Sequence, residues 1–127
     1  MPCLIDTDVL IHALSGDAHA PILSRIDAAI VDKARYSVVT RMELLGWSGH
    51  TAVSRRETEA LLAQLMEVTL TPAIVAAVIG IRSTIAIKLP DAIIAASALV
   101  ENLPLMTRNT SDFKRISGLA LIDPFSA

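Results

Sequence analysis

Short apolar runs alternate along this chain with longer segments in which apolar residues recur every three or four positions. A short, continuously apolar run is typical of a buried strand, and the longer spacing predicts an amphipathic helix. The pattern predicts strands at residues 3–5, 36–39, 68–70, 103–106 and 119–122. It predicts helices at residues 9–14, 22–30, 54–66, 72–85 and 92–101, and a further helix that begins at residue 40. Strands that alternate with helices indicate an α/β sandwich around a mostly parallel sheet.

Turn and cap residues mark several of the boundaries between these elements. The segment Ser15-Gly16-Asp17 is expected to end the first helix. Ser54 and Glu57 have the spacing of a capping box at the start of another helix. Pro72 stands at a first-turn position, where its missing N–H costs little, and is expected to start a long helix. Pro90 is expected to stop that helix and to start the next.

The composition is unusually apolar for a soluble protein, because 53% of the 127 residues are hydrophobic and the mean hydropathy is +0.55. Two causes are expected to act together: strands buried on both faces under Ala-rich helices, and apolar surface covered by another chain. Arg82, Lys88 and Asp91 interrupt the most apolar region, residues 68–100, so no membrane span is expected. The start of the chain lacks a signal-peptide pattern, which predicts a cytoplasmic location. The single Cys3 is expected to pack as a small hydrophobic residue.

A net charge of −2 and a pI of about 5.8 argue against a nucleic-acid partner. The argument weakens if several of the 13 acids gather at one site while the basic residues lie elsewhere, because the electrostatic field depends on the distribution of charge rather than on its total. Aromatic residues make up only 3% of the chain, so a base-stacking platform is not expected.

Four acidic residues occupy positions that a parallel sheet would bring together. Asp6 and Glu43 follow the first and second predicted strands, Asp112 follows the fourth, and Asp91 lies in the first turn of a predicted helix. Because the carboxyl ends of parallel strands meet at the same edge of a sheet, these side chains can converge although dozens of residues separate them.

Each acid also has a purely structural interpretation. Short polar side chains before a helix cap its first turn, and acids near a helix N-terminus complement its dipole. The alternatives are a helix cap by Asp6, Thr7 or Asp8, a capping box of Thr40 with Glu43, a dipole contact by Asp91, and a cap by Asp112 before Phe113. Capping does not require the four acids to share one edge, so their common placement favours a site.

Convergence of these carboxylates would require a compensating charge. Two carboxylates ~4 Å apart repel by about 4 kcal/mol at an effective dielectric near 20, so three or four of them need a cation or protons. A ligand set of oxygens without Cys or His favours Mg²⁺ or Mn²⁺ over Zn²⁺. Such a site can hold a phosphate oxygen and activate a water, which is the chemistry of phosphodiester hydrolysis.

Four ordered motifs carry a resemblance that spans nearly the whole chain. They are residues 4–11 (LIDTDVLI), 40–44 (TRMEL), 89–96 (LPDAIIAA) and 107–113 (TRNTSDF). In this order they resemble the motifs of PIN-domain ribonucleases, and in particular of the VapC-like toxins of bacterial type II toxin-antitoxin modules. The resemblance implies a single PIN-like domain over residues 1–127, folded as a three-layer α/β/α sandwich with a mostly parallel sheet of about four to five strands. It also implies a metal-dependent endoribonuclease that leaves 5′-phosphate and 3′-hydroxyl ends.

By the same resemblance, four acids would be the catalytic and metal-binding set, with Mg²⁺ as the cofactor and Mn²⁺ able to substitute. They are Asp6, Glu43, Asp91 and Asp112. Thr107 and Asn109 would be polar supports, and Arg108 would contact the substrate. One position departs from the common Asp-Thr-Asn pattern, because this chain has Asp6-Thr7-Asp8. Asp8 could add a metal ligand or a charge next to the ligands, or it could cap a helix; we interpret it as a helix cap and leave it outside the catalytic set.

The expected partners are an RNA substrate, a second copy of the chain in a homodimer, and a cognate antitoxin. VapC-like proteins are silenced by an antitoxin segment that fills an apolar groove and can place a basic side chain against the acids. Helices at 22–30 and 47–66 are candidate groove walls, and Trp47 is either an interface anchor or a core residue. Basic residues that can contact backbone phosphates are Arg41, Arg55, Arg56, Arg82, Lys88 and Arg108.

Two other interpretations of the sequence stay open. A haloacid-dehalogenase-like phosphatase would use Asp6 as a nucleophile and Asp8 as an acid/base, but Gly-Thr after the second Asp and a cap domain are both lacking. A non-catalytic PIN-like binding module would keep its acids for structural reasons alone. A trapped aspartyl-phosphate would favour the phosphatase, and metal-dependent turnover would exclude the binding module.

Overall fold

The structure is a computed structural model that describes residues 1–16 and 19–126. Within these residues five strands form one all-parallel sheet in the order β3-β2-β1-β4-β5. The strands are β1 (Leu4–Ile5), β2 (Arg35–Ser37), β3 (Met66–Val68), β4 (Leu105–Met106) and β5 (Leu121–Ile122). The helices are α1 (Thr7–Ser15), α2 (Ala20–Val31), α3 (Val38–Leu45), α4 (Ala52–Ala63), α5 (Pro72–Thr84), α6 (Leu89–Val100) and α7 (Thr110–Phe113).

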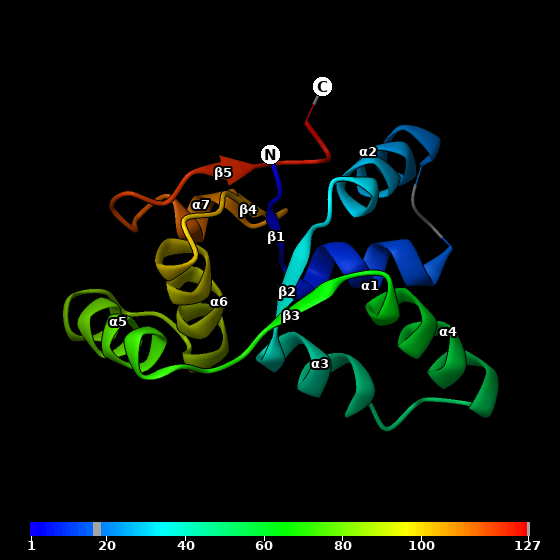
Figure 1. Cartoon of the computed structure of the whole chain (residues 1–127), viewed down its shortest axis with the longest axis horizontal. Coiled ribbons are helices and arrows are strands. Elements are labelled where there is room, and N and C mark those ends of the chain that lie inside the picture. Colours follow the sequence, from blue (N-terminus) through cyan, green and yellow to red (C-terminus); the bar gives the residue numbers. More distant parts are fainter. Residues whose placement is uncertain (17–18, 127) are drawn as a thin grey trace.

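Helices cover both faces of the sheet, as predicted. Figure 1 shows α5 and α6 on one side of the strands and α1, α2 and α4 on the other. Successive residues of a strand point to opposite faces, so Leu4 packs with α5 and α6 while Ile5 packs with α1 and α2. Leu105 and Met106 of β4 divide in the same way. The predicted three-layer α/β/α sandwich is confirmed.

The order of the strands defines the edge where ligands bind in such sheets. The chain runs from β1 outward to β2 and β3, and then returns to place β4 on the other side of β1. The boundary between β1 and β4 is therefore the point where the direction of winding reverses. In open α/β sheets the crevice outside the carboxyl ends of the strands at this point is the usual binding site. Asp6 and Thr107 directly follow these two strands.

Several predicted boundaries were wrong by two or three residues, among them the following three. Residues 38–39, predicted as strand, form the first turn of α3, because the Ser37 hydroxyl accepts a hydrogen bond from Val39 N at 3.2 Å and caps the helix. The capping box of α4 pairs Thr51 with Ser54 rather than Ser54 with Glu57, so the helix begins earlier. The strand predicted at residues 68–70 is β3, at Met66–Val68.

The ends of the other helices follow their local signals more closely. Thr71 caps α5 and Pro72 opens it, as predicted, whereas the helix ends at Thr84 rather than being stopped by Pro90. Gly16 ends α1 in a left-handed conformation with φ of 78°. Asp17, predicted to share this turn, lies outside the described residues. In the part of the chain that is described, no helix is both long and apolar enough to span a membrane.

Candidate active site

The centre of the site is a buried carboxylate that hydrogen bonds hold at both oxygens. Asp6 follows β1, and Thr107 follows the neighbouring β4, so the parallel register places them side by side. The Thr107 hydroxyl donates to Asp6 Oδ2 at 2.8 Å, and Thr7 N donates to Asp6 Oδ1 at 2.9 Å. Asp6 is 6% exposed and Thr107 is fully buried. The sheet therefore fixes one carboxylate at its carboxyl edge.

Glu43 joins this edge through a pair of threonines. The Thr7 hydroxyl donates to Glu43 Oε1 at 2.8 Å, and it lies 2.9 Å from the hydroxyl of Thr40. Because Thr7 has one hydroxyl proton, Thr40 is the donor in the second bond. The interpretation of Thr40 and Glu43 as a capping box is wrong, since Ser37 caps α3 and Thr40 is buried inside that helix. Glu43 is thus held toward the end of β1 rather than toward its own helix start.

A turn after β4 connects the Asp6 region to Asp112. Asn109 N donates to the Thr107 hydroxyl at 3.0 Å, and the Asn109 side-chain amide donates to Asp112 Oδ2 at 2.8 Å. Asp112 lies within α7, whose N-cap position is Asn109, so the interpretation of Asp112 as a cap is also wrong. Asp91 lies in the first turn of α6, as predicted, and is half-buried.

The mutual electrostatic effects show that the aspartates meet at one edge. Burial, followed by the charge of Asp8, raises the pKa of Asp6 to about 7, with a further contribution from Asp91. The hydrogen bonds from Thr107 and Thr7 act in the opposite direction. Burial first, and then the charges of Asp112 and Asp8, raise the pKa of Asp91, while Lys88 lowers it. Residues far apart in the sequence thus form one cluster of like charge.

Asp8 is part of this cluster, and the prediction that it caps a helix is wrong. The N-cap of α1 is Asp6, whose side chain accepts from Thr7 N. Asp8 lies in the first turn of α1, with its Oδ1 atom buried. Among the described residues this oxygen has no hydrogen-bond partner.

The donor set fits a hard divalent cation. It consists of carboxylate oxygens that repel one another, and one of these oxygens is buried without a donor. Such sets suit Mg²⁺ or Mn²⁺. Among residues 1–16 and 19–126 no three Asp, Glu, His or Cys side chains gather closely enough to make a complete metal site as they stand. The carboxylates thus lie at one edge of the sheet but do not surround a single point.

The basic residues near the cluster match the expected set only in part. Lys88 acts on Asp91, as its effect on the pKa shows. Arg108, expected to contact the substrate, has its guanidinium 5.1 Å from the ring centre of Phe125 and 2.7 Å from His12 Nε2. It is therefore engaged by the C-terminal segment and α1.

Arg115 was not predicted, because it lies outside the motifs and no spacing signal marks it. Its side chain donates to the backbone carbonyls of Asp112 and Ala86, at 3.0 and 3.1 Å. It therefore ties the turn that carries Asp112 to the segment before α6. Arg41, a candidate phosphate contact, forms an ion pair with Glu67 instead.

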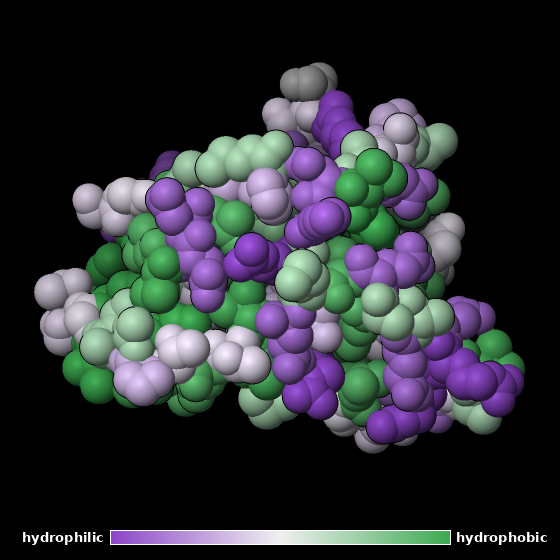
Figure 2. Space-filling view, viewed as in Figure 1, coloured by the Kyte–Doolittle hydropathy of each residue, from purple (hydrophilic) through white to green (hydrophobic). Residues whose placement is uncertain are grey.

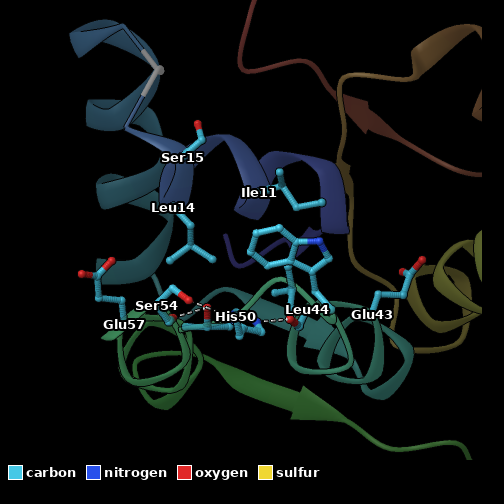
Figure 3. Close-up of a pocket in the computed structure, with 10 residues that line it drawn as sticks. Ile11, Leu14, Ser15, Glu43, Leu44, His50, Ser54 and Glu57 are labelled. Atoms are coloured by element: carbon cyan, nitrogen blue, oxygen red, sulfur yellow. Dashed lines mark hydrogen bonds between the residues drawn. The ribbon is translucent and has the colours of Figure 1, made fainter. Parts of the chain in front are cut away.

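An apolar groove of about 340 Å³ begins at Glu43 and runs between α1, α3 and α4. Trp47 lines it and is 61% exposed, so this side chain does not belong to the core. Figure 3 shows Glu43 and Glu57 at opposite ends of the groove, with Ile11 and Leu14 above its floor.

The groove walls match the prediction only in part. Residues within the predicted wall at 47–66 line this groove, whereas the predicted wall at 22–30 does not, because Ile22 and Ile26 of α2 are buried in the core and α1 faces the groove. His50 fixes the loop after α3, since its Nε2 donates to the Leu44 carbonyl at 2.6 Å and its Nδ1 bonds the Ser54 hydroxyl at 2.9 Å.

The described residues thus form an α/β protein with an all-parallel sheet and acidic residues at its carboxyl edge. A family model for the PIN domain matches residues 3–119, so the chain belongs to the PIN domain family. No significant sequence match was found among curated proteins.

Several solved structures of toxin-antitoxin systems share this fold. A chain of a toxin-antitoxin complex from Klebsiella pneumoniae is 27% identical, with a TM-score of 0.76 and 98% of this chain and 99% of that chain covered. A chain of VapBC-1 from nontypeable Haemophilus influenzae is 25% identical, with a TM-score of 0.84 and coverages of 99% and 100%. A chain of VapBC2 from Rickettsia felis, bound to a promoter DNA fragment, is 20% identical, with a TM-score of 0.85 and coverages of 96% and 98%. The resemblance to VapC-like proteins predicted from the motifs is confirmed.

Proposed function

We propose that this chain, as a single PIN-like domain, is a Mg²⁺-dependent endoribonuclease and the toxin of a toxin-antitoxin pair. The observation that carries the proposal is the convergence of Asp6, Asp91 and Asp112 at the carboxyl edge of the sheet, where each raises the pKa of a neighbour or has its own pKa raised. A structural role alone does not require such repulsion. Membership of the PIN family and the toxin-antitoxin relatives support the same assignment.

Asp6, Glu43 and Asp91 would hold Mg²⁺, and Asp112 would complete the set. The cation supplies Lewis-acid polarisation of the scissile phosphate and lowers the pKa of water, which allows hydrolysis near neutral pH. Thr107 and Thr7 N fix the Asp6 carboxylate by hydrogen bonds to both of its oxygens. Carboxylates held in this way need little reorganisation when they bind a cation or a charged transition state.

The other polar residues position the acids. The Thr7 hydroxyl holds Glu43, and the Asn109 amide holds Asp112, so each exposed acid has one oxygen restrained and one available. Asp6 binds a proton near neutral pH and must lose it before it can act as a ligand. Protons and Mg²⁺ therefore compete for Asp6, and the Mg²⁺ concentration needed for cleavage is expected to rise as the pH falls below 7.

The chemistry of the cut ends tests the proposed reaction. Purified protein incubated with a mixed RNA pool and Mg²⁺ is expected to leave 5′-phosphate and 3′-hydroxyl ends, because a water molecule attacks the phosphorus. Ends carrying a 2′,3′-cyclic phosphate would contradict it, since they arise from attack by the ribose hydroxyl. An aspartyl-phosphate on Asp6 would instead favour the phosphatase interpretation, and folded protein without turnover would favour the binding module.

We propose that the antitoxin places a segment in the groove that begins at Glu43. The middle of the groove is apolar, with Trp47 exposed, and both of its ends are acidic. This pattern fits a segment with large apolar side chains flanked by Arg or Lys. A basic side chain at the Glu43 end would lie beside the metal-binding acids and would compete with the cation.

Trp47→Ala is expected to weaken binding of the antitoxin by about 2 kcal/mol or more, because an exposed Trp in an apolar groove has the character of an interface hot spot. Calorimetric titration of the purified pair measures this effect. Val53→Ala, an exposed apolar change on α4 outside the groove lining, is the matched control and is expected to bind like the wild type. Equal affinities for wild type and Trp47→Ala would remove this groove as the binding site.

We also propose a homodimer. Figure 2 shows hydrophobic residues gathered over α5, at the left of the molecule. Val75, Ile79 and Leu89 of α5 and α6 are 41%, 65% and 49% exposed. Exposed apolar patches on soluble proteins commonly mark interaction surfaces, and a second copy would cover this one.

A further inference from the structure

Asp8 is the one member of the acidic cluster that the proposed metal set does not use. Its Oδ1 atom is buried and has no hydrogen-bond partner in the described part of the chain. Burying a carboxylate oxygen without a donor costs free energy, and more for a charged group than for a neutral one. None of the ion pairs found between described residues involves Asp8. The structure thus presents an acceptor whose natural complement is a cation.

The position of Asp8 places this acceptor beside the proposed metal site, because Asp8 lies in the first turn of α1, two residues after the N-cap Asp6. Its charge is the largest Coulombic contribution to the pKa of Asp6, and it also acts on Asp91 of α6. Thr7, between the two aspartates, turns the other way and hydrogen-bonds Thr40 and Glu43. Asp8 is therefore close to the two acids that follow β1 and open α6.

Helix capping offers no competing explanation for this acid. Asp6 is the N-cap of α1, and it already accepts from Thr7 N. Asp8 follows in the first turn, where its negative charge interacts favourably with the helix dipole. The same charge is unfavourable beside the Asp6 carboxylate, whose pKa it raises. Capping therefore does not account for the buried Oδ1 atom of Asp8, which has no hydrogen-bond partner among the described residues.

We propose that Asp8 is a further metal-binding carboxylate of this site, which binds the same divalent cation as Asp6 and Asp91. The inference rests on the proposed metal-dependent function. With Asp8 the site carries five acids. The repulsion between carboxylates in the metal-free protein is therefore stronger, and binding of the cation stabilises the protein more.

The test is Mn²⁺ binding, measured by the electron paramagnetic resonance signal of free Mn²⁺ without any RNA. Asp8→Asn keeps the size of the side chain and removes its charge. We expect its affinity for Mn²⁺ to fall about tenfold or more, because loss of one carboxylate removes both a ligand and part of the attracting charge. In EDTA the same variant is expected to melt at a higher temperature than the wild type.

Asp27→Asn on the exposed face of α2 is the matched control for the change in charge, and it is expected to bind Mn²⁺ like the wild type. Asp8→Ser is the second variant, because Ser is well tolerated near a helix N-terminus, and it should lose affinity as Asp8→Asn does. Circular dichroism verifies that both variants fold.

The outcomes separate this inference from the proposed function. If Asp6→Asn weakens Mn²⁺ binding while Asp8→Asn and Asp8→Ser bind like the wild type, the role of Asp8 is overturned and the metal site stands. If Asp6→Asn and Asp91→Asn also bind like the wild type, the metal site itself is overturned. Loss of affinity in all four variants supports both.

Discussion

Asp6→Asn is expected to lower the rate of RNA cleavage on the order of 1000-fold while the fold remains intact. Asn has the size of Asp and can still accept the hydrogen bond from Thr7 N, but it lacks the charge that binds a cation and stabilises the transition state. Initial rates on an end-labelled RNA with Mg²⁺ measure the effect, and circular dichroism verifies the fold.

The control for this change is Asp27→Asn, which removes the same charge from an exposed position on α2. Its cleavage rate is expected to equal that of the wild type. A rate for Asp6→Asn within tenfold of the wild type would contradict the placement of Asp6 at the centre of the site.

The metal-free protein is expected to lose stability as the pH rises from about 4 to about 7. Burial and the charge of Asp8 raise the pKa of Asp6 from 3.8 to about 7, so between these values the folded protein binds more protons than the unfolded chain. The free energy of unfolding therefore falls with rising pH in this window. The full change in pKa corresponds to about 4 kcal/mol, which is an upper value for the loss.

Urea unfolding in EDTA at a series of pH values measures this dependence. Asp6→Asn is the control, because its profile should lose most of the fall between pH 4 and 7. Saturating Mn²⁺ is expected to restore stability at pH 7 and above, since the cation neutralises the charges that the proton otherwise neutralises. A free energy of unfolding that rises steadily through this window in EDTA would contradict a buried, repelled Asp6.

The convergence of the acids could be predicted from the sequence because it follows from topology. Asp6 and Thr107 come directly after apolar runs, and parallel strands place their carboxyl ends at one edge whatever the details of packing. The sequence also placed Asp91 in the first turn of a predicted helix and Asp112 after the fourth predicted strand. The order of motifs added the family, which the match to the PIN domain confirms.

The direction of individual side chains could not be predicted, because it depends on where each helix begins. The first helix begins at Thr7 rather than at Val9, and each residue of shift turns the side chains by about 100° around the axis. Asp8 therefore enters the acidic cluster instead of capping the helix. Which helix lines the groove depends on how the helices pack over the sheet, so α1 could not be predicted in place of α2.

Hydrogen bonds between residues far apart in the sequence could not be predicted from local sequence patterns either. Thr40 and Glu43 have the spacing of a capping box, yet both bond Thr7, which is 33 and 36 residues away. Only the packing of α3 against α1, which begins at Thr7, reveals this arrangement. The cap of α3 itself is supplied by Ser37, and it converts two β-branched residues from strand to helix.

The central claim is that the acids at the carboxyl edge form one metal-dependent hydrolytic site. The most direct test incubates wild-type protein with a mixed RNA pool and Mg²⁺, beside the same reaction in EDTA and a reaction with Asp91→Asn. Cleavage by the wild type that disappears in both of the other reactions is the predicted result. Cleavage that persists in EDTA, or in Asp91→Asn at the wild-type rate, would contradict the claim.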